Sequence, residues 1–383
     1  MKIPCYVWSK QGEIEQSAIE QIKNASSLPF AFHHTVLCPD AHLGYGAPIG
    51  GILATKGYVI VNFVGVDIGC GMIATKTSLR AEELTTDHIK ETMELIMGLV
   101  PVGFKHQERW QEWEGFSTPP ESPVIKNQLD RARKQLGTLG GGNHFIEIQC
   151  GEDEHIWIMV HSGSRNFGLC IAKYYNDKAI ELCERWKSPI PNKDLAFLPI
   201  GEPLAKEYIG AMNYALAFAE ENRSRIMIAA VDSFNAITGG EAGEVINIHH
   251  NYARIENHFG HNVWIHRKGA TSARAGELGI IPGSMGTPSY IVEGLGNRDS
   301  FMSCSHGAGR CMGRKAASRN LTVEECDGAM DGIVFGRWGK DRKGNIDLGE
   351  APQAYKPIDE VINAQLDLIK PIVKLYPMGV IKG

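Results

Sequence analysis

The chain has 383 residues, of which 43% are hydrophobic and 22% are charged, and its formal net charge is −5. These values are typical of a globular protein with a large core, and the length allows one to three domains. They argue against a protein that coats nucleic acid by bulk electrostatics, although a local basic groove is compatible with them. No apolar stretch reaches the roughly 18 residues that a membrane span needs, and no signal peptide follows Met1. The sequence therefore predicts a cytoplasmic protein with no membrane partner, whose nine cysteines are reduced.

Strand-like runs and turns dominate residues 30–75 and 136–168, and a helical stretch covers roughly 81–99. The segment from Leu204 to about Ile237 is predicted to form one long helix, because its apolar residues recur at helical spacing. Proline-rich loops at 119–123 and 189–193 are not domain boundaries, since histidine-bearing turns fall on both sides of each. The sequence therefore predicts an α+β fold with mixed sheets and surrounding helices in a single domain, residues 1–383.

Short apolar runs repeatedly lie beside glycine-rich turns that carry polar residues, histidine above all. The turns are Asp67–Gly71, Gly140–His144, His161–Arg165, His249–Asn251, His266–Gly269 and His306–Arg310. Strands rich in β-branched and aromatic residues form a rigid scaffold that presents polar residues on loops at its ends. Glycine lets a ligand approach the backbone closely, so the clustering indicates loops shaped around a ligand.

Five residues in these turns have the chemistry of metal ligands. Asp67 and Cys70 lie three residues apart, and a thiolate can bridge two metal ions while a carboxylate offers one of them a hard ligand. His144, His161 and His250 would complete a site for one or two first-row divalent ions. Asp67 or Cys70 alone would more often be a turn cap or a small buried residue. Five such residues in matching contexts favour the metal site.

Other histidines are interpreted by whether they too lie in a glycine-rich turn beside a short apolar run. Those that do not are interpreted as surface or structural residues: His33, His34, His106, His258 and His261. His42 follows Pro39-Asp40-Ala41 in a further glycine turn, and its role stays open.

Two further turns have the composition of a phosphate site. Ser305–Arg310 combines His306 with two flexible glycines and a guanidinium. Taken alone, His306 is explained equally well as a nucleophile and as an ordinary turn histidine. Pro282–Thr287 supplies backbone and hydroxyl donors. Phosphoryl chemistry needs metal ions together with Lys or Arg, and the chain offers both. The H-E-x-x-H motif of zinc peptidases, the Walker phosphate loop and the K-x-D-G motif of ordinary ligases are all absent.

In these turns and in other short sequence blocks, the chain resembles the RtcB family of RNA-splicing ligases, which join RNA ends using GTP and manganese. The resemblance extends over nearly the whole chain, in ordered blocks: Pro39–Gly46, Gly65–Met72, Gly140–His144, His161–Arg165, His266–Thr271, Pro282–Met285, His306–Arg310 and Gly379–Gly383. Chance does not produce such an ordered set. The resemblance implies a single-domain RtcB-like fold around a central dinuclear metal site.

The resemblance implies a role for each matching residue. Cys70 would bridge two Mn²⁺ ions, one completed by Asp67 and His144 and the other by His161 and His250. His306 would be guanylylated on an imidazole nitrogen. Other contacts to the nucleotide would come from Asn143, Glu147, His250, Asn251, Pro282, Ser284, Met285, Gly307, Ala308, Gly309, Arg310, Tyr355 and Lys382. Among these, Asn143, Ser284 and Arg310 would hold phosphate oxygens, and Glu147 and Lys382 would contact guanine. Tyr355 is equally well explained as a half-buried aromatic residue.

The implied reaction has three nucleotidyl steps. His306 takes GMP from GTP, GMP moves to an RNA 3′-phosphate, and the 5′-hydroxyl of a second RNA then expels GMP. A 2′,3′-cyclic phosphate end would first be hydrolysed to a 3′-phosphate. The function would be RNA repair or tRNA splicing, with an archease-type activator as a further partner. The alternative is a dinuclear metal phosphodiesterase or phosphatase, which would need neither His306 nor Glu147 and Lys382.

The chain also departs from the family pattern. It is shorter than the longer members of the family. The segment His34–Cys38 replaces the family's usual sequence before the Pro39-Asp40 block, and Gly313-Arg314 stands where the family pattern has Ser-Arg. These changes leave the metal and nucleotide positions intact and point to a diverged bacterial paralogue that repairs particular nicked RNAs. The aromatic and charged segment 104–116 could touch RNA, but an amphipathic surface loop is favoured.

Overall fold

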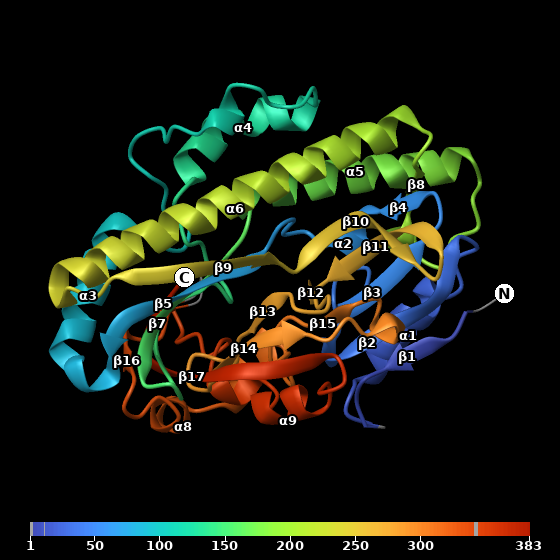
Figure 1. Ribbon diagram of the computed structural model, residues 1–383. Coiled ribbons are helices and arrows are strands. Elements are labelled where there is room, and N and C mark those ends of the chain that lie inside the picture. The colour runs from blue at the N-terminus through green and yellow to red at the C-terminus, as the bar shows by residue number, and fades with distance from the viewer. Residues whose placement is uncertain (1–2, 11, 341–343) are drawn as a thin grey trace.

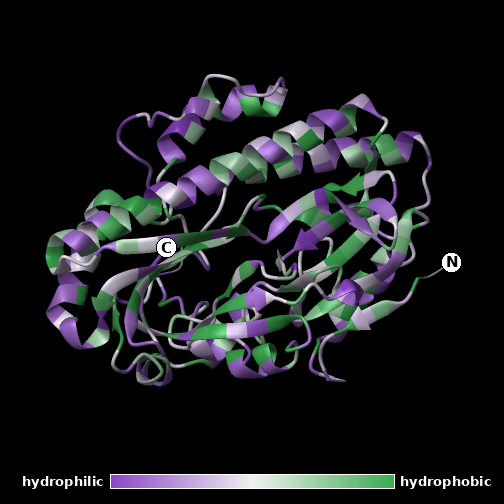
Figure 2. Ribbon diagram, viewed as in Figure 1, coloured by the Kyte–Doolittle hydropathy of each residue, from purple (hydrophilic) through white to green (hydrophobic). Residues whose placement is uncertain are grey.

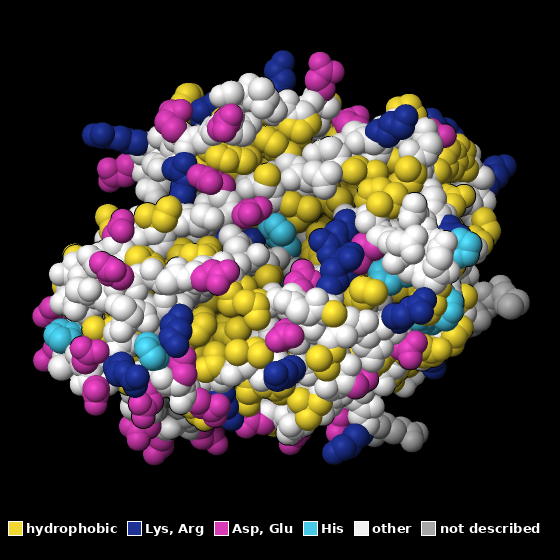
Figure 3. Space-filling model, viewed as in Figure 1, with side chains coloured by type: hydrophobic (Ala, Val, Ile, Leu, Met, Phe, Trp, Pro, Cys, Tyr) yellow, Lys and Arg dark blue, Asp and Glu magenta, His cyan; other side chains and the backbone are white. Residues whose placement is uncertain are grey.

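The computed structural model describes residues 3–10, 12–340 and 344–383. A layer of long helices lies across two β-sheets that meet near the middle of the molecule (Figure 1). Basic and acidic side chains are interspersed over the face shown in Figure 3, rather than gathered into one field of a single sign. This distribution agrees with the small net charge of the chain, −5.

In the described residues the larger sheet has eight strands, in the order β13-β14-β17-β6-β7-β5-β9, with β16 beside β17. All its pairs are antiparallel except β16 with β17. Its strands are β5 (Gly71–Arg80), β6 (Phe145–Gly151), β7 (His155–Ser162), β9 (Ala242–His249), β13 (Leu278–Ile281), β14 (Ser289–Gly294), β16 (Val334–Phe335) and β17 (Ile369–Lys382).

The smaller sheet has the order β1-β2-β3-β11-β10. Its strands are β1 (Cys5–Val7), β2 (Ala31–His42), β3 (Ile49–Thr55), β10 (Asn251–His258) and β11 (His261–Lys268). Two short ribbons pair β4 (Tyr58–Ile60) with β8 (Phe197–Pro199) and β12 (Ala270–Ser272) with β15 (Ser303–Ser305). Because β9 of the larger sheet ends at His249 and β10 of the smaller sheet begins at Asn251, His250 lies at the junction of the two sheets.

Helix α6 (Pro203–Thr238) crosses the larger sheet over β5 and β7, and α5 (Arg165–Arg185) runs beside it. Hydrophilic and hydrophobic residues alternate along both helices (Figure 2), as expected for helices with one buried face. Phe167 of α5 and Phe218 of α6 are fully buried, with ring centroids 5.2 Å apart. The other helices are α1 (Gln16–Ala25), α2 (Val61–Val64), α3 (Thr86–Leu99), α4 (Pro123–Gln135), α7 (Arg314–Asn320), α8 (Val323–Gly328) and α9 (Ile358–Asn363).

The predicted α+β class is confirmed, and so is the long helix, which the structure extends to Pro203–Thr238. The predicted helix over 81–99 begins only at Thr86, after a short 3₁₀ turn. Two details within the strand-like regions were wrong. Val61–Val64 is helical and fully buried, and a short buried apolar run has no periodicity that separates helix from strand. Residues 165–168 open α5 instead of extending a strand.

Helix α4 was not predicted at all. It begins at Pro123, the last residue of the predicted loop at 119–123, and proline is well suited to the first position of a helix. The single-domain organisation over residues 1–383 stays a prediction. Within the described ranges, the structure contains no helix with the length and apolar character needed to cross a membrane.

Candidate metal and nucleotide site

The five predicted metal ligands lie together where the two sheets meet. The Cys70 Sγ atom is 3.4 Å from His144 Nε2 and 3.3 Å from His161 Nε2. The Asp67 carboxylate approaches the same His144 nitrogen at 3.3 Å. The ligand atoms form two overlapping sets, Asp67–Cys70–His144 and Cys70–His161–His250, and within each set all atoms lie within 4.8 Å of one another. Cys70 therefore belongs to both candidate sets, and its bridging of two metal ions stays a prediction.

Backbone carbonyls orient two of the imidazole ligands. His144 Nδ1 is 3.0 Å from the Leu139 carbonyl oxygen, and His161 Nδ1 is 3.1 Å from that of Asn143. A proton on His161 Nδ1 can be donated to the Asn143 carbonyl, and Nε2 then presents its lone pair toward Cys70. His144 Nδ1 lies equally close to the Leu139 carbonyl, to which it can donate, and to the Arg165 guanidinium, from which it can only accept. Such outer hydrogen bonds fix the tautomer of histidine ligands in metal sites.

The site also contains a buried imidazole nitrogen for which the described residues provide no hydrogen-bond partner. His250 is 2% exposed, and its Nδ1 has no hydrogen-bond partner among the described residues. A buried imidazole nitrogen without a partner is costly unless a ligand satisfies it. One soft thiolate, three imidazoles and one carboxylate suit first-row divalent ions. The residues present therefore fit two such ions that share Cys70.

Burial sets the protonation states of these ligands. It lowers the pKa of His161 and of His250 well below the usual value, so both rings are neutral, the form that binds metals. Burial likewise raises the pKa of the Cys70 thiol, and the nearby Asp67 charge raises it further. Binding of a metal ion must therefore displace a proton from Cys70.

His306, the predicted nucleophile, lies directly beside this cluster. Its ring centroid is 4.8 Å from that of His250. On its other side, His306 Nδ1 is 2.7 Å from Asp40 Oδ2, which also accepts the His306 backbone N–H at 3.1 Å. Burial would raise the pKa of Asp40, but the hydrogen bond and charge of His306 outweigh it and lower this pKa. Ionised Asp40 accepts the Nδ1 proton, so in the neutral ring Nε2 is the nitrogen that carries the lone pair.

If His306 takes GMP, as the family resemblance implies, Asp40→Asn should slow that transfer by roughly 10³–10⁴-fold, as loss of an orienting carboxylate does in other histidine enzymes. The amide can donate to Nδ1 and so stabilise the tautomer whose Nε2 is protonated. The rate is measured in a single turnover with labelled GTP, alongside metal content and thermal unfolding. A wild-type rate in a folded, metal-loaded Asp40→Asn protein would contradict this role.

Strand pairing brings the predicted guanine contacts together. In the register of β17 on β6, Val380 lies opposite Glu147, and Lys382 lies opposite Phe145. Glu147 is 1% exposed and accepts a hydrogen bond from Gln149 Nε2 at 2.6 Å. Burial raises the pKa of Glu147 and lowers that of Lys382, although their opposite charges counteract both shifts.

The predicted phosphate loops also meet. The Ala308 N–H donates to the Pro282 carbonyl at 2.9 Å, which joins the His306–Arg310 loop to the loop that carries Ser284. Asn251 joins two other turns of the site: its Nδ2 donates to the Asp67 carbonyl at 3.0 Å, and its Oδ1 accepts from Gly269 N at 2.8 Å. The side chain of Met285, in contrast, is buried in a core cluster.

Glu350 has a role that the sequence analysis missed. Its carboxylate accepts hydrogen bonds from Arg310 at 3.3 Å, from Arg314 at 2.6 Å and from the Tyr355 hydroxyl, and Lys382 Nζ lies 3.6 Å away. The Tyr355 ring also packs under the Arg310 guanidinium, 4.8 Å from its centroid. Glu350 therefore positions Arg310 and Lys382, and the packing of Tyr355 is accounted for by these contacts. Nothing in the segment 348–351 signals this role.

Two other residues at the site were missed. Asp40 belongs to the Pro39–Gly46 block, but the sequence alone assigned it no role. Arg165 follows the His161 turn, and its Nη1 is 3.0 Å from His144 Nδ1. Among the histidines predicted to be structural, His34 and His258 are buried outside the metal cluster. His42, whose role was open, lines a cavity next to the site.

The fold and the site define a mixed α+β protein in which a cysteine-centred group of candidate metal ligands adjoins a carboxylate-held histidine. The chain belongs to the RtcB family, because the family model described as "tRNA-splicing ligase RtcB" matches residues 21–383. The family predicted from the sequence is thereby confirmed.

Relatives in this family match almost end to end. "RNA-splicing ligase RtcB" of Escherichia coli strain K12 is 40% identical, over 99% of this chain and 97% of the relative. "tRNA-splicing ligase RtcB" of Pyrobaculum aerophilum is 32% identical, over 100% of this chain and 95% of the relative. "RNA-splicing ligase RtcB" of Mycobacterium tuberculosis is 29% identical, over 95% of this chain and 100% of the relative.

Proposed function

We propose that the protein is an RNA ligase that joins RNA 3′-phosphate or 2′,3′-cyclic phosphate ends to 5′-hydroxyl ends through a histidine–GMP intermediate. The observation that carries the proposal is the placement of His306 between Asp40 and His250. A hydrolase with two metal ions would not need a histidine whose Nε2 is held free in this way. The ligase names of the relatives support the same class.

In the first step, His306 Nε2 attacks the α-phosphorus of GTP. An N–P bond forms, the P–O bond to pyrophosphate breaks, and Asp40 holds the Nδ1 proton. An oxygen of the RNA 3′-phosphate then attacks the same phosphorus and releases His306. In the last step, the 5′-hydroxyl of the second RNA attacks the activated 3′-phosphate and expels GMP.

The remaining side chains bind and neutralise the substrates. Two Mn²⁺ ions, one held by Asp67, Cys70 and His144 and the other by Cys70, His161 and His250, would offset the negative charge of the phosphates. Arg310, positioned by Glu350, would hold phosphate oxygens together with Asn143 and Ser284. Glu147 would accept hydrogen bonds from the guanine edge, and Lys382 would donate to the guanine carbonyl.

Glu147→Gln should weaken GTP binding and remove its pH dependence. Burial raises the pKa of Glu147, so its carboxylate form, which guanine needs as acceptor, is lost as the pH falls through this raised value. In the wild type, GTP affinity should therefore increase with pH above the ordinary glutamate range of about 4.3. The variant should lose about 10–100-fold in affinity, as expected for a hydrogen bond to a charged group. Equilibrium binding of GTP and ATP across pH checks this; an unchanged pH profile and GTP preference would contradict the guanine contact.

A sealing assay tests the proposed function against the hydrolase alternative. Wild-type protein is incubated with an RNA ending in a 2′,3′-cyclic phosphate, a 5′-hydroxyl RNA, GTP and Mn²⁺. A joined product that requires GTP is expected. Conversion of the cyclic phosphate to a 3′-phosphate with no joining would instead favour the phosphodiesterase.

We place the reaction in the cytoplasm, because all nine cysteines are free and the Cys70 thiol must stay reduced to serve as a ligand. The archease-type activator and the role in repair of particular nicked RNAs stay predictions from the family resemblance. Sealing assays with and without such an activator, on nicked tRNA and on other RNAs, would test both.

A further inference from the structure

A cavity of about 1030 Å³ lies behind the segment that carries Asp40, the carboxylate that holds His306. Asp40, which holds the His306 ring, is flanked in the chain by Pro39 and Ala41, and both line the cavity. Arg310, at the end of the His306 loop, lines it as well. Pockets for small ligands have volumes of about 300–1,000 Å³, so this cavity is at the upper end of that range. The cavity therefore reaches the residues on either side of Asp40 and the last residue of the His306 loop, and it extends away from them.

One wall of the cavity carries cations without partners. Lys315 and Arg319 of α7 lie four residues apart, so they project from the same side of the helix, and both are exposed. Neither side chain forms an ion pair or hydrogen bond with another part of the chain that the structure describes. Arg310 and Arg314 on the same wall are instead held by Glu350. Lys315 and Arg319 are thus available to bind an anion.

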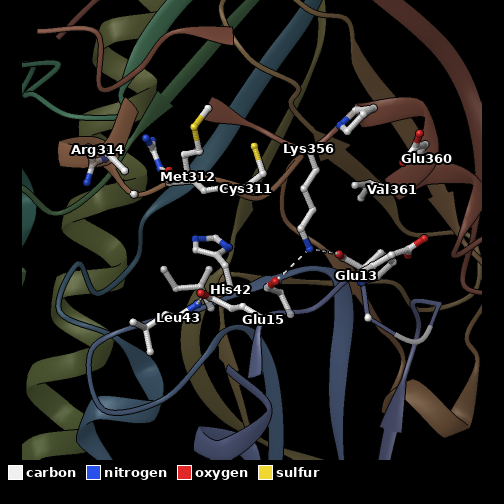
Figure 4. A pocket seen from close by; sticks show the side chains of 18 of the residues that line it. Glu13, Glu15, His42, Leu43, Cys311, Met312, Arg314, Lys356, Glu360 and Val361 are labelled. Atoms are coloured by element: carbon white, nitrogen blue, oxygen red, sulfur yellow. Dashed lines mark hydrogen bonds between the residues drawn. The ribbon is translucent and has the colours of Figure 1, made fainter. Parts of the chain in front are cut away.

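The facing wall has acceptors and apolar surface. Figure 4 shows the His42 ring pointing into the cavity, with Leu43 and Glu15 nearby. His42 Nδ1 is 2.9 Å from the Asp40 carbonyl oxygen, and when it donates there, Nε2 remains an acceptor facing the cavity. Lys356 fixes this wall, because its Nζ donates to the carbonyls on either side of Asp40, at 2.8 and 3.1 Å.

The difference between the cationic wall and the wall of acceptors and apolar surface matches the two sides of a single strand of nucleic acid. Phosphates along the backbone would meet Lys315 and Arg319, while bases would turn their N–H edges and apolar faces to the wall of His42, Glu15 and Leu43. Carboxylates accept hydrogen bonds from base amino groups but repel phosphates. A duplex carries phosphates on both of its sides and would bring one set against these carboxylates. The cavity is therefore suited to an unpaired RNA end.

We propose that this cavity binds the last nucleotides of the RNA strand that ends in the 3′-phosphate, with Lys315 and Arg319 on its backbone phosphates. The inference rests on the proposed ligase function. This strand is the one whose terminal phosphate must reach the phosphorus carried by His306, and the cavity includes Arg310, the last residue of the His306 loop. The 5′-hydroxyl strand enters only in the last step and attacks a different phosphorus.

The test separates GMP transfer from sealing. Wild-type protein and the Lys315→Glu/Arg319→Glu variant are first guanylylated, freed of GTP, and mixed with a 3′-phosphate RNA oligonucleotide alone. The variant should form its GMP adduct at the wild-type rate. Its half-saturating RNA concentration for GMP transfer should rise by at least about tenfold, with little change in the maximal rate. The slope of log affinity against log salt should become shallower by about 0.7 for each lost phosphate contact.

Two further variants exclude a general effect of charge or misfolding. Lys173→Glu/Arg185→Glu makes the same change in net charge on α5, outside the cavity, and should behave as the wild type. Lys315→Ala/Arg319→Ala removes the cations without adding acidic groups and should show a smaller defect in the same direction. Thermal unfolding of each variant verifies the fold.

Unchanged GMP transfer in both α7 variants would overturn the proposal, and so would a defect confined to sealing with the 5′-hydroxyl strand. Failure of the proposed function would be visible separately, because the wild type would then form no GMP adduct in the first stage. A shift as large in the α5 variant would also overturn the proposal, since the cavity would then have no special role.

Discussion

His306→Ala should abolish the covalent GMP adduct and, with it, all RNA sealing. Asp40 and the His306 backbone hold this imidazole in one orientation beside the metal ligands, and alanine leaves no nucleophile there. The residual rate should fall below about one thousandth of the wild-type rate, since covalent catalysis through the first step is lost. The measurement is label from GTP retained on denatured protein, together with the metal content of the same sample.

A matched control for this prediction is His261→Ala. His261 lies exposed at the start of β11, and outside the site it contacts the Phe32 ring. This variant should retain the adduct, and both variants should retain their metal. Adduct formation by His306→Ala at the wild-type level would remove His306 from the role of nucleophile.

Cys70→Ala should remove metal from both ligand sets, because its Sγ atom belongs to each of them. Loss of a residue that only hydrogen-bonds to a metal ligand already lowers metal affinity by about 10–100-fold. Loss of the ligand that both sets share should therefore lower it by more than about 100-fold. Adduct formation and sealing should be lost with the metal. Manganese content after dialysis and direct titration with Mn²⁺ measure the effect.

Cys38→Ala provides the control for Cys70→Ala. Cys38 is also a fully buried cysteine, but it packs in a hydrophobic cluster with Val36 and Ile52. This variant should lose stability through its small cavity and still bind metal normally. Full manganese occupancy in a folded Cys70→Ala protein would show that Cys70 does not bridge the ions.

The candidate metal ligands could be singled out from the sequence because each lies in a short turn whose composition is itself informative. Asp67 and Cys70 share one glycine-rich turn, and the strands beside His144 and His161 have a clear β-branched pattern. The structure then brings these turns to one place, as the recurring pattern suggested. The long helix α6 was predictable for a similar reason, since its periodicity persists over many turns.

Asp40 and Glu350 could not be assigned from the sequence, because their roles depend on contacts between distant segments. Asp40 meets His306 across 266 positions in the chain, and Glu350 meets Arg310 across 40. Neither a carboxylate in a strand, as Asp40 is, nor one in a turn, as Glu350 is, gives a local sign of such a partner. The short helix α2 was missed because four buried residues carry too little periodicity to exclude a strand.

The most direct measurement incubates the pure protein with Mn²⁺ and α-labelled GTP or ATP, and scores the label that remains on the denatured protein. The account predicts an acid-labile adduct that forms with GTP and not with ATP, as expected for a phosphoramidate on His306 beside a guanine site. The absence of any adduct from a metal-loaded protein, with either nucleotide, would contradict the ligase mechanism and favour a metal-dependent hydrolase.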